Sequence, residues 1–293
     1  MNGVIVVDKP QDWTSHDVVN RMRRLAGTKK VGHLGTLDPM ATGVLPLMLN
    51  KATRLAQFFS MNEKTYEGTV RFGFATNTYD AEGEATSPDA APALSEDQAE
   101  RLFAPFRGTF QQVPPVVSAK KINGRPAHEL ARKNIPVEMK PVEVTVLALD
   151  ILRVEGSEVD IRVHCTAGTY LRSIAHDAGC LLGCGAHLSR LRRIQSGAFA
   201  IAQARTLEQL GALAEAGNLA EALIPSAQLL PGIPLEYVDQ MTETHIRQGR
   251  DFRVSPFRSR GEARLVKAVN GEGELIAIGE AVLPNIYHPM LVL

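Results

Sequence analysis

Residues 142–154 and 158–165 constrain the fold more than any other part of the chain, because both are long, rich in β-branched side chains and alternately apolar and polar. Alternation with a period of two is typical of half-buried strands. Only Glu155, Gly156 and Ser157 separate the two stretches, so they are placed to pair as a hairpin. The other helical and strand-like patterns follow one another in mixed order. The sequence therefore predicts an α+β fold with a mixed, largely antiparallel sheet.

Shorter patterns predict further elements in the first half of the chain. Residues 3–7 and 66–73 indicate strands. The acidic segment 82–93 is rich in Gly, Ala and Pro and indicates a mobile loop. After it, Ser95 and Gln98 have the spacing of a capping box, which predicts the start of a short helix.

The end of the chain has a different character. Pro225, Pro231 and Pro234 lie close together and indicate a linker. After it, residues 262–269 and 274–283 are strand-like and are separated by an Asn-Gly-Glu-Gly sequence, which favours a hairpin turn. The pattern predicts a small β-barrel-like unit at the end of the chain.

Charged residues are segregated along the sequence, although 32 basic and 32 acidic residues leave no net charge. Residues 80–100 contain seven acids and no base, whereas residues 247–267 contain seven bases and two acids. Further basic runs are formed by Arg21, Arg23, Arg24, Lys29 and Lys30, by Lys120, Lys121, Arg125, Arg132 and Lys133, and by Arg190, Arg192 and Arg193. Such segregation favours one face that holds phosphates, whereas each run taken alone is more typical of an ordinary solvated surface.

Cysteine and histidine spacing raises the question of a metal site. His176, Cys180, Cys184 and His187 would lie along one stripe of a helix, in the manner of zinc ligands. A straight helix, however, rises about 12 Å over eight residues, too far for all four side chains to reach one ion, so we predict no metal. The odd number of cysteines and the absence of an apolar run of roughly 20 residues predict a cytoplasmic protein with no membrane span.

Residues 32–43 isolate one carboxylate, Asp38, among glycines and a proline. Pro39 disfavours the α conformation at Asp38, and Gly35 and Gly43 permit turns or close approaches that a side chain would block. The segment lacks the Gly-Lys-Ser/Thr ending of a phosphate-binding P-loop. Two interpretations remain: an ordinary turn, or a shaped loop that presents an acid.

The same segment resembles the active-site loop of the TruB-type family, the tRNA pseudouridine synthases that modify uridine 55 in the T-loop. The motifs that carry the resemblance are Asp8–Pro10, Thr14–Asp17, Gly32–Gly43, Lys64–Tyr66, Gly168–Ser173, Gly185–Leu188 and Leu191–Arg193. The resemblance implies a pseudouridine-synthase catalytic domain over residues 1–230, with an RNA-binding insertion at about 107–140. It also implies a PUA-type RNA-binding domain over residues 235–293.

The implied activity is an isomerisation that cleaves the N1–C1′ glycosidic bond of uridine 55 and rejoins the base through C5. This reaction has no net redox change, so no cofactor is expected. The implied partner is the T-arm of tRNA, with no obligatory protein partner, and the expected state is a monomer. Two alternatives stay open: a pseudouridine synthase with a different or additional RNA target, and a tRNA-binding or tRNA-folding protein without turnover.

Three residues carry the implied chemistry. Asp38 is the catalytic carboxylate, which stabilises or covalently traps the oxocarbenium-like sugar. Arg172 pairs with Asp38 and favours its ionised form. Tyr66 stacks on the target base and is a candidate to take the C5 proton. An unperturbed phenol with a pKa of about 10 is a poor base near neutrality, so proton transfer through water is a rival.

Further residues are implied to hold the RNA or to support the loop, namely His33, Tyr170, Leu191, Lys9, Lys64 and Lys121. His33 is expected to contact the space that flipped nucleotides leave, and Lys9 to support the active-site loop. The sequence departs from the usual pattern of the family at Asp12, Asn77, Val117 and His128. None of these departures falls on a proposed catalytic residue.

Overall fold

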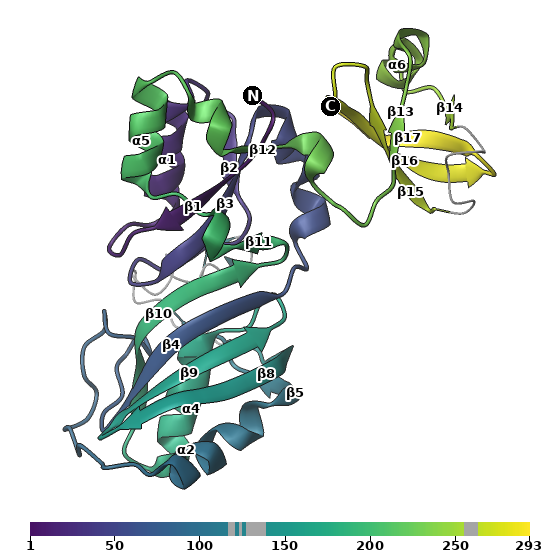
Figure 1. Cartoon of the computed structure of the whole chain (residues 1–293). Coiled ribbons are helices and arrows are strands. Elements are labelled where there is room, and N and C mark those ends of the chain that lie inside the picture. Colours follow the sequence, from purple (N-terminus) through teal and green to yellow (C-terminus); the bar gives the residue numbers. More distant parts are fainter. Residues whose placement is uncertain (117–120, 123–124, 127–138, 255–262) are drawn as a thin grey trace.

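A computed structural model describes residues 1–116, 121–122, 125–126, 139–254 and 263–293, with only the backbone at 121–122 and 125–126. The described chain forms a large sheet, a smaller C-terminal sheet and the short pair β6 (Lys121–Ile122) and β7 (Arg125–Pro126) (Figure 1). Most of the predicted insertion at 107–140, with Val117 and His128, lies outside the described residues. None of the described helices is long and apolar enough to cross a membrane.

The large sheet has ten strands. They are β1 (Gly3–Lys9), β2 (Val31–His33), β3 (Thr42–Leu49), β4 (Lys64–Phe72), β5 (Gly108–Gln112), β8 (Val142–Glu155), β9 (Glu158–Cys165), β10 (Ala186–Ser196), β11 (Phe199–Ala200) and β12 (Leu223–Pro225). Their order is β12-β1-β3-β10-β4-β9-β8-β5, with β2 beside β3 and β11 beside β10. Only the pair β3–β10 is parallel among these neighbours. The predicted mixed, largely antiparallel sheet is confirmed, and so is the β8–β9 hairpin.

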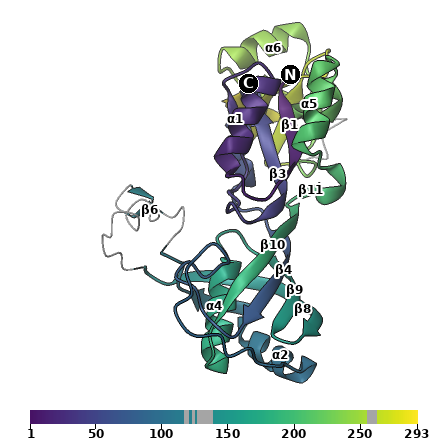
Figure 2. The same cartoon turned by 90° about the vertical axis from the view of Figure 1, so that its left-hand side faces the viewer.

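Helices cover the two halves of this sheet separately. The helices are α1 (Ser15–Leu25), α2 (Glu96–Phe103), α4 (Leu171–Leu182), α5 (Leu207–Glu215) and α6 (Gln240–Arg247), with 3-10 helices η1 (Asn50–Phe59), η2 (Ala104–Phe106), η3 (Ile201–Gln203), η4 (Leu219–Ala222) and η5 (Ser226–Gln228). Helices α1 and α5 lie side by side over the β1–β3 half, and α2 and α4 lie over the β4–β9–β8 half (Figures 1 and 2). The predicted capping box of Ser95 and Gln98 is present at α2.

Helix α4 is fixed by an apolar face that packs into the core. Leu171, Ile174, Ala175 and Ala178 are each at most 4% exposed and belong to the same buried cluster as strand residues such as Ile161. Burying a leucine or isoleucine side chain contributes roughly 1.5–3 kcal/mol. The start of α4, with the residues that immediately follow Leu171, is therefore held at a defined place against the sheet.

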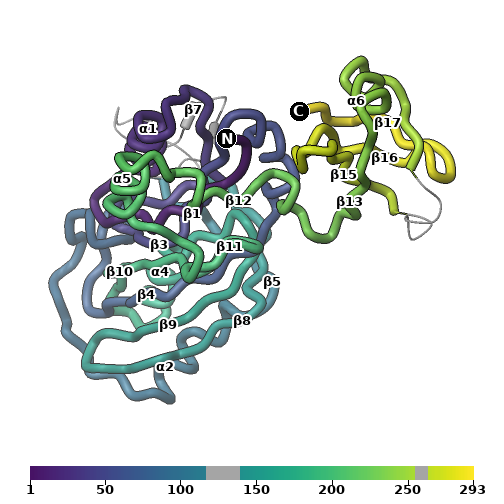
Figure 3. The backbone as a smooth tube through the Cα atoms, turned by 45° about the horizontal axis from the view of Figure 1, so that its top comes forward, coloured from purple at the N-terminus to yellow at the C-terminus, as the bar shows by residue number. Residues whose placement is uncertain are grey.

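The C-terminal sheet contains the strands β13 (Leu235–Tyr237), β14 (Phe252–Arg253), β15 (Leu265–Val269), β16 (Leu275–Leu283) and β17 (Ile286–Val292). Their order is β13-β15-β16-β17-β14, and they form a curled half-barrel beside the large sheet (Figures 1 and 3). The predicted hairpin is confirmed, because β15 pairs antiparallel with β16.

The half-barrel also packs against the rest of the chain. Leu275 and Leu293 share a buried cluster with Phe59 and Phe199. Lys267 is 4% exposed, and its Nζ donates hydrogen bonds to the carbonyl oxygens of Ala227 (2.9 Å) and Leu229 (2.8 Å). Lys267 therefore joins the two parts of the chain and does not contribute to a basic surface.

The parallel contact between β3 and β10 requires a glycine at position 43. Gly43 has φ +99°, and a Cβ added there would lie 2.2 Å from the carbonyl oxygen of Arg193. Gly27 also has a positive φ, +61°, but a Cβ there would meet no atom within 4 Å.

We therefore predict that Gly43→Ala costs more stability than the matched control Gly27→Ala. Gly27→Ala pays only for backbone strain, about 1 kcal/mol, whereas Gly43→Ala must also separate β3 from β10 and should cost at least about 2 kcal/mol more. Denaturant unfolding of both variants measures the difference. Equal losses would show that the sheet tolerates a wider spacing at this contact.

Candidate active site

Asp38 lies in the loop between β2 and β3, and both of its neighbours in the chain are fixed. The Ser15 hydroxyl accepts a hydrogen bond from the Leu37 amide (2.8 Å) and lies 3.0 Å from the Leu37 carbonyl oxygen, to which it donates. On the other side, Lys9 Nζ donates to the carbonyl oxygen of Pro39 (3.0 Å). The backbone around the carboxylate is therefore held by α1 and β1.

Lys9 is fully buried, at 0% exposed, and binds backbone rather than solvent. Besides Pro39, its Nζ donates to the carbonyl oxygens of Pro10 (2.8 Å) and Trp13 (2.5 Å). Burial lowers the pKa of Lys9 to about 8, although nearby carboxylates oppose that change. The three carbonyl oxygens tie the first turn of the chain to the Asp38 loop.

Arg172, the second residue of α4, joins two carboxylates. Its Nε lies 3.0 Å from Asp38 Oδ2, and its Nη2 donates to Asp38 Oδ1 at 3.3 Å. Its Nη1 donates to Asp80 Oδ2 (3.1 Å) and to the carbonyl oxygen of Thr78 (3.1 Å). Arg172 is 4% exposed and Asp80 only 2% exposed, so the contacts with Asp80 lie inside the protein while Asp38 faces outward.

The environment of Asp38 changes the pKa of its carboxyl. Burial raises that pKa above the ordinary value for aspartate, and the negative charge of Asp80 adds to the rise. The positive charges of Arg172 and Lys9 act in the opposite direction. The loop thus presents a carboxylate that is desolvated but has a cation directly beside it.

Arg193 holds the same loop by its backbone. This side chain is 0% exposed, and it donates from Nε to the Val44 carbonyl oxygen (2.7 Å) and from Nη2 to that of Gly35 (3.0 Å). The Thr36 carbonyl oxygen lies 3.5 Å from Nη1. A buried cation of this kind is accommodated because several oxygen atoms surround it.

The prediction that Arg190, Arg192 and Arg193 contribute to one basic surface is wrong for two of the three. Arg193 is buried, and Arg192 makes a two-point contact with Asp8, at 3.1 and 2.7 Å. Only Arg190 stays largely exposed, with 67% of its side chain in solvent. The alternation of a strand explains the difference, because Arg193 points to the opposite face from Arg190 and Arg192.

A cavity of about 540 Å³ opens beside Asp38, between the two halves of the large sheet. The sequence-predicted residues that line it are Asp38, Lys64, Tyr66, Tyr170, Arg172 and Leu191. Lys9 and His33 do not line it, and the side chain of Lys121 is outside the described part of the chain. Six of the nine predicted site residues, which are far apart in the sequence, thus meet at one cavity.

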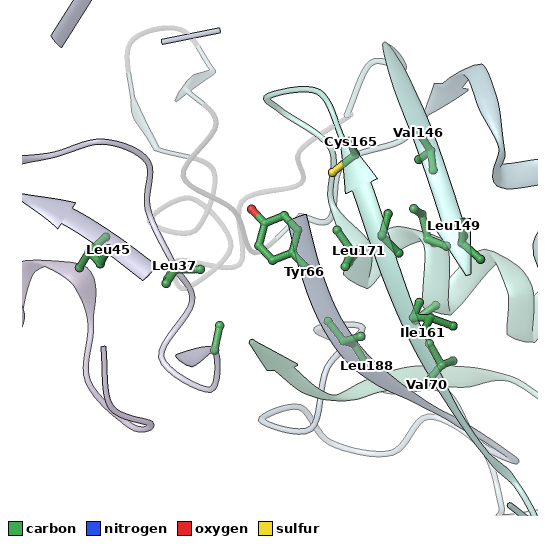
Figure 4. Close-up of a cluster of buried hydrophobic side chains, with 14 of the residues drawn as sticks. Leu37, Leu45, Tyr66, Val70, Val146, Leu149, Ile161, Cys165, Leu171 and Leu188 are labelled. Atoms are coloured by element: carbon green, nitrogen blue, oxygen red, sulfur yellow. The ribbon is translucent and has the colours of Figure 1, made fainter. Parts of the chain in front are cut away.

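Tyr66 lies at the base of this cavity on β4. It is 8% exposed, and its ring lies between Leu37 of the loop and Leu171 of α4, with the hydroxyl oxygen directed away from the apolar cluster (Figure 4). Burial raises the pKa of the Tyr66 phenol, although Arg193 beside it opposes the rise. The phenol is therefore neutral near pH 7, which makes it a still weaker base than an exposed tyrosine.

Polar contacts also fix the start of α4. The Gln112 amide donates to the Tyr170 carbonyl oxygen (3.0 Å) and accepts from the Tyr170 amide (2.8 Å). One turn further, the Ser173 hydroxyl donates to the Val113 carbonyl oxygen (2.8 Å). Strand β5 therefore sets the position from which Arg172 reaches Asp38.

Sequence reasoning did not identify Asp80, Gln112 or Arg193 as site residues. Asp80 stands in an acidic segment that resembles a solvated loop, and nothing in the sequence marks its burial. Gln112 is a lone amide at the end of a short strand. For Arg193 a signal did exist, because it shares a strand face with Leu191, two residues earlier, as the cross-strand partners Tyr66 and Gly68 also do.

The histidine and cysteine stripe does not form a metal site. His187 contacts the Phe74 carbonyl oxygen through Nδ1 (3.1 Å), whereas Cys180 Sγ lies 3.6 Å from His176 Nε2. Within the described ranges, no three or more His, Cys, Asp or Glu side chains are grouped to hold a metal ion.

Comparison with known families agrees with this arrangement. The family model described as "TruB family pseudouridylate synthase (N terminal domain)" matches residues 23–171, and "tRNA pseudouridylate synthase B C-terminal domain" matches residues 172–231. The chain belongs to the TruB family of pseudouridylate synthases. The resemblance of its motifs to this family is thereby confirmed.

Individual TruB-family proteins match over the whole chain. The tRNA pseudouridine synthase B of Solibacter usitatus (strain Ellin6076) is 57% identical over 293 residues and 100% of both chains. The protein of that name from Paenarthrobacter aurescens (strain TC1) is 43% identical, over 95% of this chain and 91% of its own. Among solved structures, an H/ACA RNP bound to a substrate RNA containing 2′-deoxyuridine includes a chain with a TM-score of 0.70 and 27% identity, over 99% of this chain and 84% of that one. A Cbf5-Nop10-Gar1 complex gives a TM-score of 0.69 and 29% identity, over 97% and 79%.

The raised pKa of Asp38 predicts a particular pH dependence. On acidification Asp38 takes up its proton at a higher pH than an ordinary aspartate, so a reaction that needs the carboxylate should lose rate with an apparent pKa above about 3.9. Single-turnover rates at saturating enzyme between pH 4 and 8 measure this. Circular dichroism over the same range serves as the control for folding, and a rate that stays constant down to pH 4 would contradict the prediction.

Proposed function

We propose that this protein converts uridine 55 in the T-loop of tRNA to pseudouridine, with Asp38 as the catalytic carboxylate. The observation that carries the proposal is the contact of Arg172 with Asp38 at the wall of a cavity that also exposes Tyr66. Membership of the TruB family and relatives named tRNA pseudouridine synthase B support the reaction and the class of RNA. We infer that it acts in the cytoplasm as a monomer, without an obligatory protein partner.

The uridine must leave its stack in the T-loop before the reaction can begin, because the cavity lies within the protein wall. With the base against Tyr66, the Asp38 carboxylate faces the sugar, where it stabilises or covalently traps positive charge at C1′ as the N1–C1′ bond breaks. The uracil then turns and forms a bond from C5 to C1′. The C5 proton is lost and N1 gains one, so the product has the composition of the substrate and no cofactor is needed.

The proton carrier is better assigned to water than to the Tyr66 phenolate. Because burial raises the pKa of Tyr66, little phenolate exists near neutrality. The ring is therefore best suited to hold the face of the base, and ordered water to move the proton. Lys9 acts through the loop, because it is fully buried against carbonyl oxygens.

The remaining site residues are assigned to the RNA around the target. Tyr170, Leu191 and Lys64 line the cavity and are placed to contact the flipped nucleotide. His33 and Lys121 are assigned to the neighbouring RNA. Burial and the charge of Arg193 lower the pKa of His33, so it is neutral near pH 7 and suited to packing or to a neutral hydrogen bond.

We divide the chain into a catalytic unit, residues 1–230, and an RNA-binding PUA-type unit, residues 235–293. In the second unit Arg247, Arg250 and Arg253 are exposed. Arg247 is paired with Glu243, so Arg250 and Arg253 are the better candidates for phosphate contacts.

Asp38→Asn should abolish pseudouridine formation and leave tRNA affinity within about tenfold, or ~1.4 kcal/mol, because it removes the reacting carboxylate and preserves size. The measurement is pseudouridine mapping by position on an unmodified tRNA transcript, in EDTA and without nucleotide, together with tRNA binding. We expect modification at position 55 by the native protein alone.

A transcript with cytidine at position 55 is the matched substrate control. Modification at another uridine by the native protein would favour a different RNA target, and binding without modification would favour a tRNA-binding protein. Turnover by Asp38→Asn would remove Asp38 from the reaction.

Replacing both Arg250 and Arg253 by Glu should weaken tRNA binding and leave the single-turnover rate at saturation unchanged. Because each lost phosphate contact releases fewer counterions, the fall of log affinity with log salt should become less steep by roughly 0.7–0.9 per contact. Arg101→Glu on α2 is the matched control, since Arg101 is exposed in the acidic region. An unchanged salt slope in the double variant would mean that this surface does not hold RNA.

A further inference from the structure

Tyr79 and His176 form a stacked pair next to the candidate active site. Their ring centroids are 3.8 Å apart and the ring planes are inclined by 13°. Tyr79 belongs to the loop that follows β4, and His176 lies on α4, four residues after Arg172. The pair therefore connects that loop to the helix that carries Arg172.

The backbone of Tyr79 has an unusual conformation, with φ 66°. This left-handed region is unfavourable for a residue with a bulky side chain, and it persists only where the surroundings enforce it. The residues on either side of Tyr79 are the two that bind Arg172 Nη1, through the Thr78 carbonyl oxygen and the Asp80 carboxylate, each at 3.1 Å. The turn at Tyr79 thus brings both acceptors to one nitrogen atom.

Backbone hydrogen bonds anchor the two ends of this turn to β10. The Leu188 amide donates to the Tyr79 carbonyl oxygen (3.0 Å), and the Ala81 amide donates to the Leu188 carbonyl oxygen (3.1 Å). The Thr76 hydroxyl donates to the Asp80 carbonyl oxygen (2.7 Å). These bonds fix the ends of the turn, whereas the stack on His176 fixes the side chain at its centre.

We propose that Tyr79 and His176 are positioning residues, whose stack holds the left-handed turn so that Thr78 and Asp80 keep Arg172 oriented toward Asp38. The inference rests on the proposed role of Asp38 and adds a support that acts through Arg172. Neither ring lines the cavity, so the pair acts without touching the RNA base.

The surroundings of His176 favour a neutral ring. Burial lowers the pKa of His176, while Asp177, the next residue on α4, opposes the change. Its Nε2 lies 3.6 Å from Cys180 Sγ, and its buried Nδ1 has no hydrogen-bond partner among the described side chains and backbone. A neutral imidazole stacks on a phenol without exposing a charge to the interior.

The test is the pH dependence of single-turnover pseudouridine formation in His176→Ala, with the rate corrected for the folded fraction. If Arg172 is held less well, the rate at pH 7.5 should fall about threefold to tenfold while tRNA affinity stays unchanged. Asp38 should also lose part of its positive neighbour, so the acid limb of the rate should move upward by about 0.3 unit or more. The groups that face Asp38 are Arg172 from α4, Asp80 and Glu82 from the loop, Lys9 from β1 and Tyr66 from β4.

His176→Phe should restore both the rate and the acid limb, because it keeps a ring on Tyr79 and has no group to titrate. Leu181→Ala is the matched control on α4, where Leu181 is 59% exposed. Tyr79→Asn, whose side chain tolerates the left-handed conformation, removes the stack from the other side and should reproduce the effect of His176→Ala.

An unchanged acid limb in His176→Ala and Tyr79→Asn would overturn the proposal, even if both variants melt at lower temperature, because packing alone does not change the titration of Asp38. Failure of His176→Phe to restore the limb would overturn it as well. Activity in Asp38→Asn would instead refute the proposed function itself, so the two failures are distinguishable.

Discussion

The arrangement of Arg172 between Asp38 and Asp80 is the contact on which the rest of the site depends. A buried guanidinium is costly unless its hydrogen-bonding groups are satisfied, and removing one partner of a buried ion pair costs about 3–5 kcal/mol. Asp80 is 2% exposed and supplies the inner partner, whereas Asp38 supplies the outer one. Because the inner pair holds Arg172, its outer edge is available to orient a carboxylate that remains open to substrate.

This contact also joins three segments that are distant in the sequence. The loop between β2 and β3, the loop after β4 and the start of α4 meet at Arg172, and Gln112 and Ser173 hold the helix start from β5. Arg193 provides a second buried cation that binds backbone carbonyl oxygens instead of carboxylates. One arginine therefore orients the reacting carboxylate and the other shapes the loop that carries it.

Sequence patterns predicted those features that depend on local periodicity or on a motif. The β8–β9 and β15–β16 hairpins followed from alternation and turn residues, and both are confirmed. Asp38, Tyr66 and Arg172 were suggested by motifs, and they line one cavity. Asp80 could not be found in this way, because its role comes from burial beside α4, which only the tertiary structure determines. Arg193 was misread because a run of arginines was interpreted by composition instead of by strand alternation.

The attachment of the C-terminal half-barrel limits how RNA can be held. Leu275 and Leu293 pack with Phe59 and Phe199, and Lys267 donates to carbonyl oxygens outside the half-barrel, so apolar and polar contacts both fix its position. Removing this unit would uncover apolar surface on the rest of the chain, which is why point changes separate RNA binding from folding better than truncation. If Arg250 and Arg253 bind phosphates, they do so at a fixed distance from the cavity. RNA held there would then be presented to Asp38 in one register, because the half-barrel and the large sheet share a buried cluster.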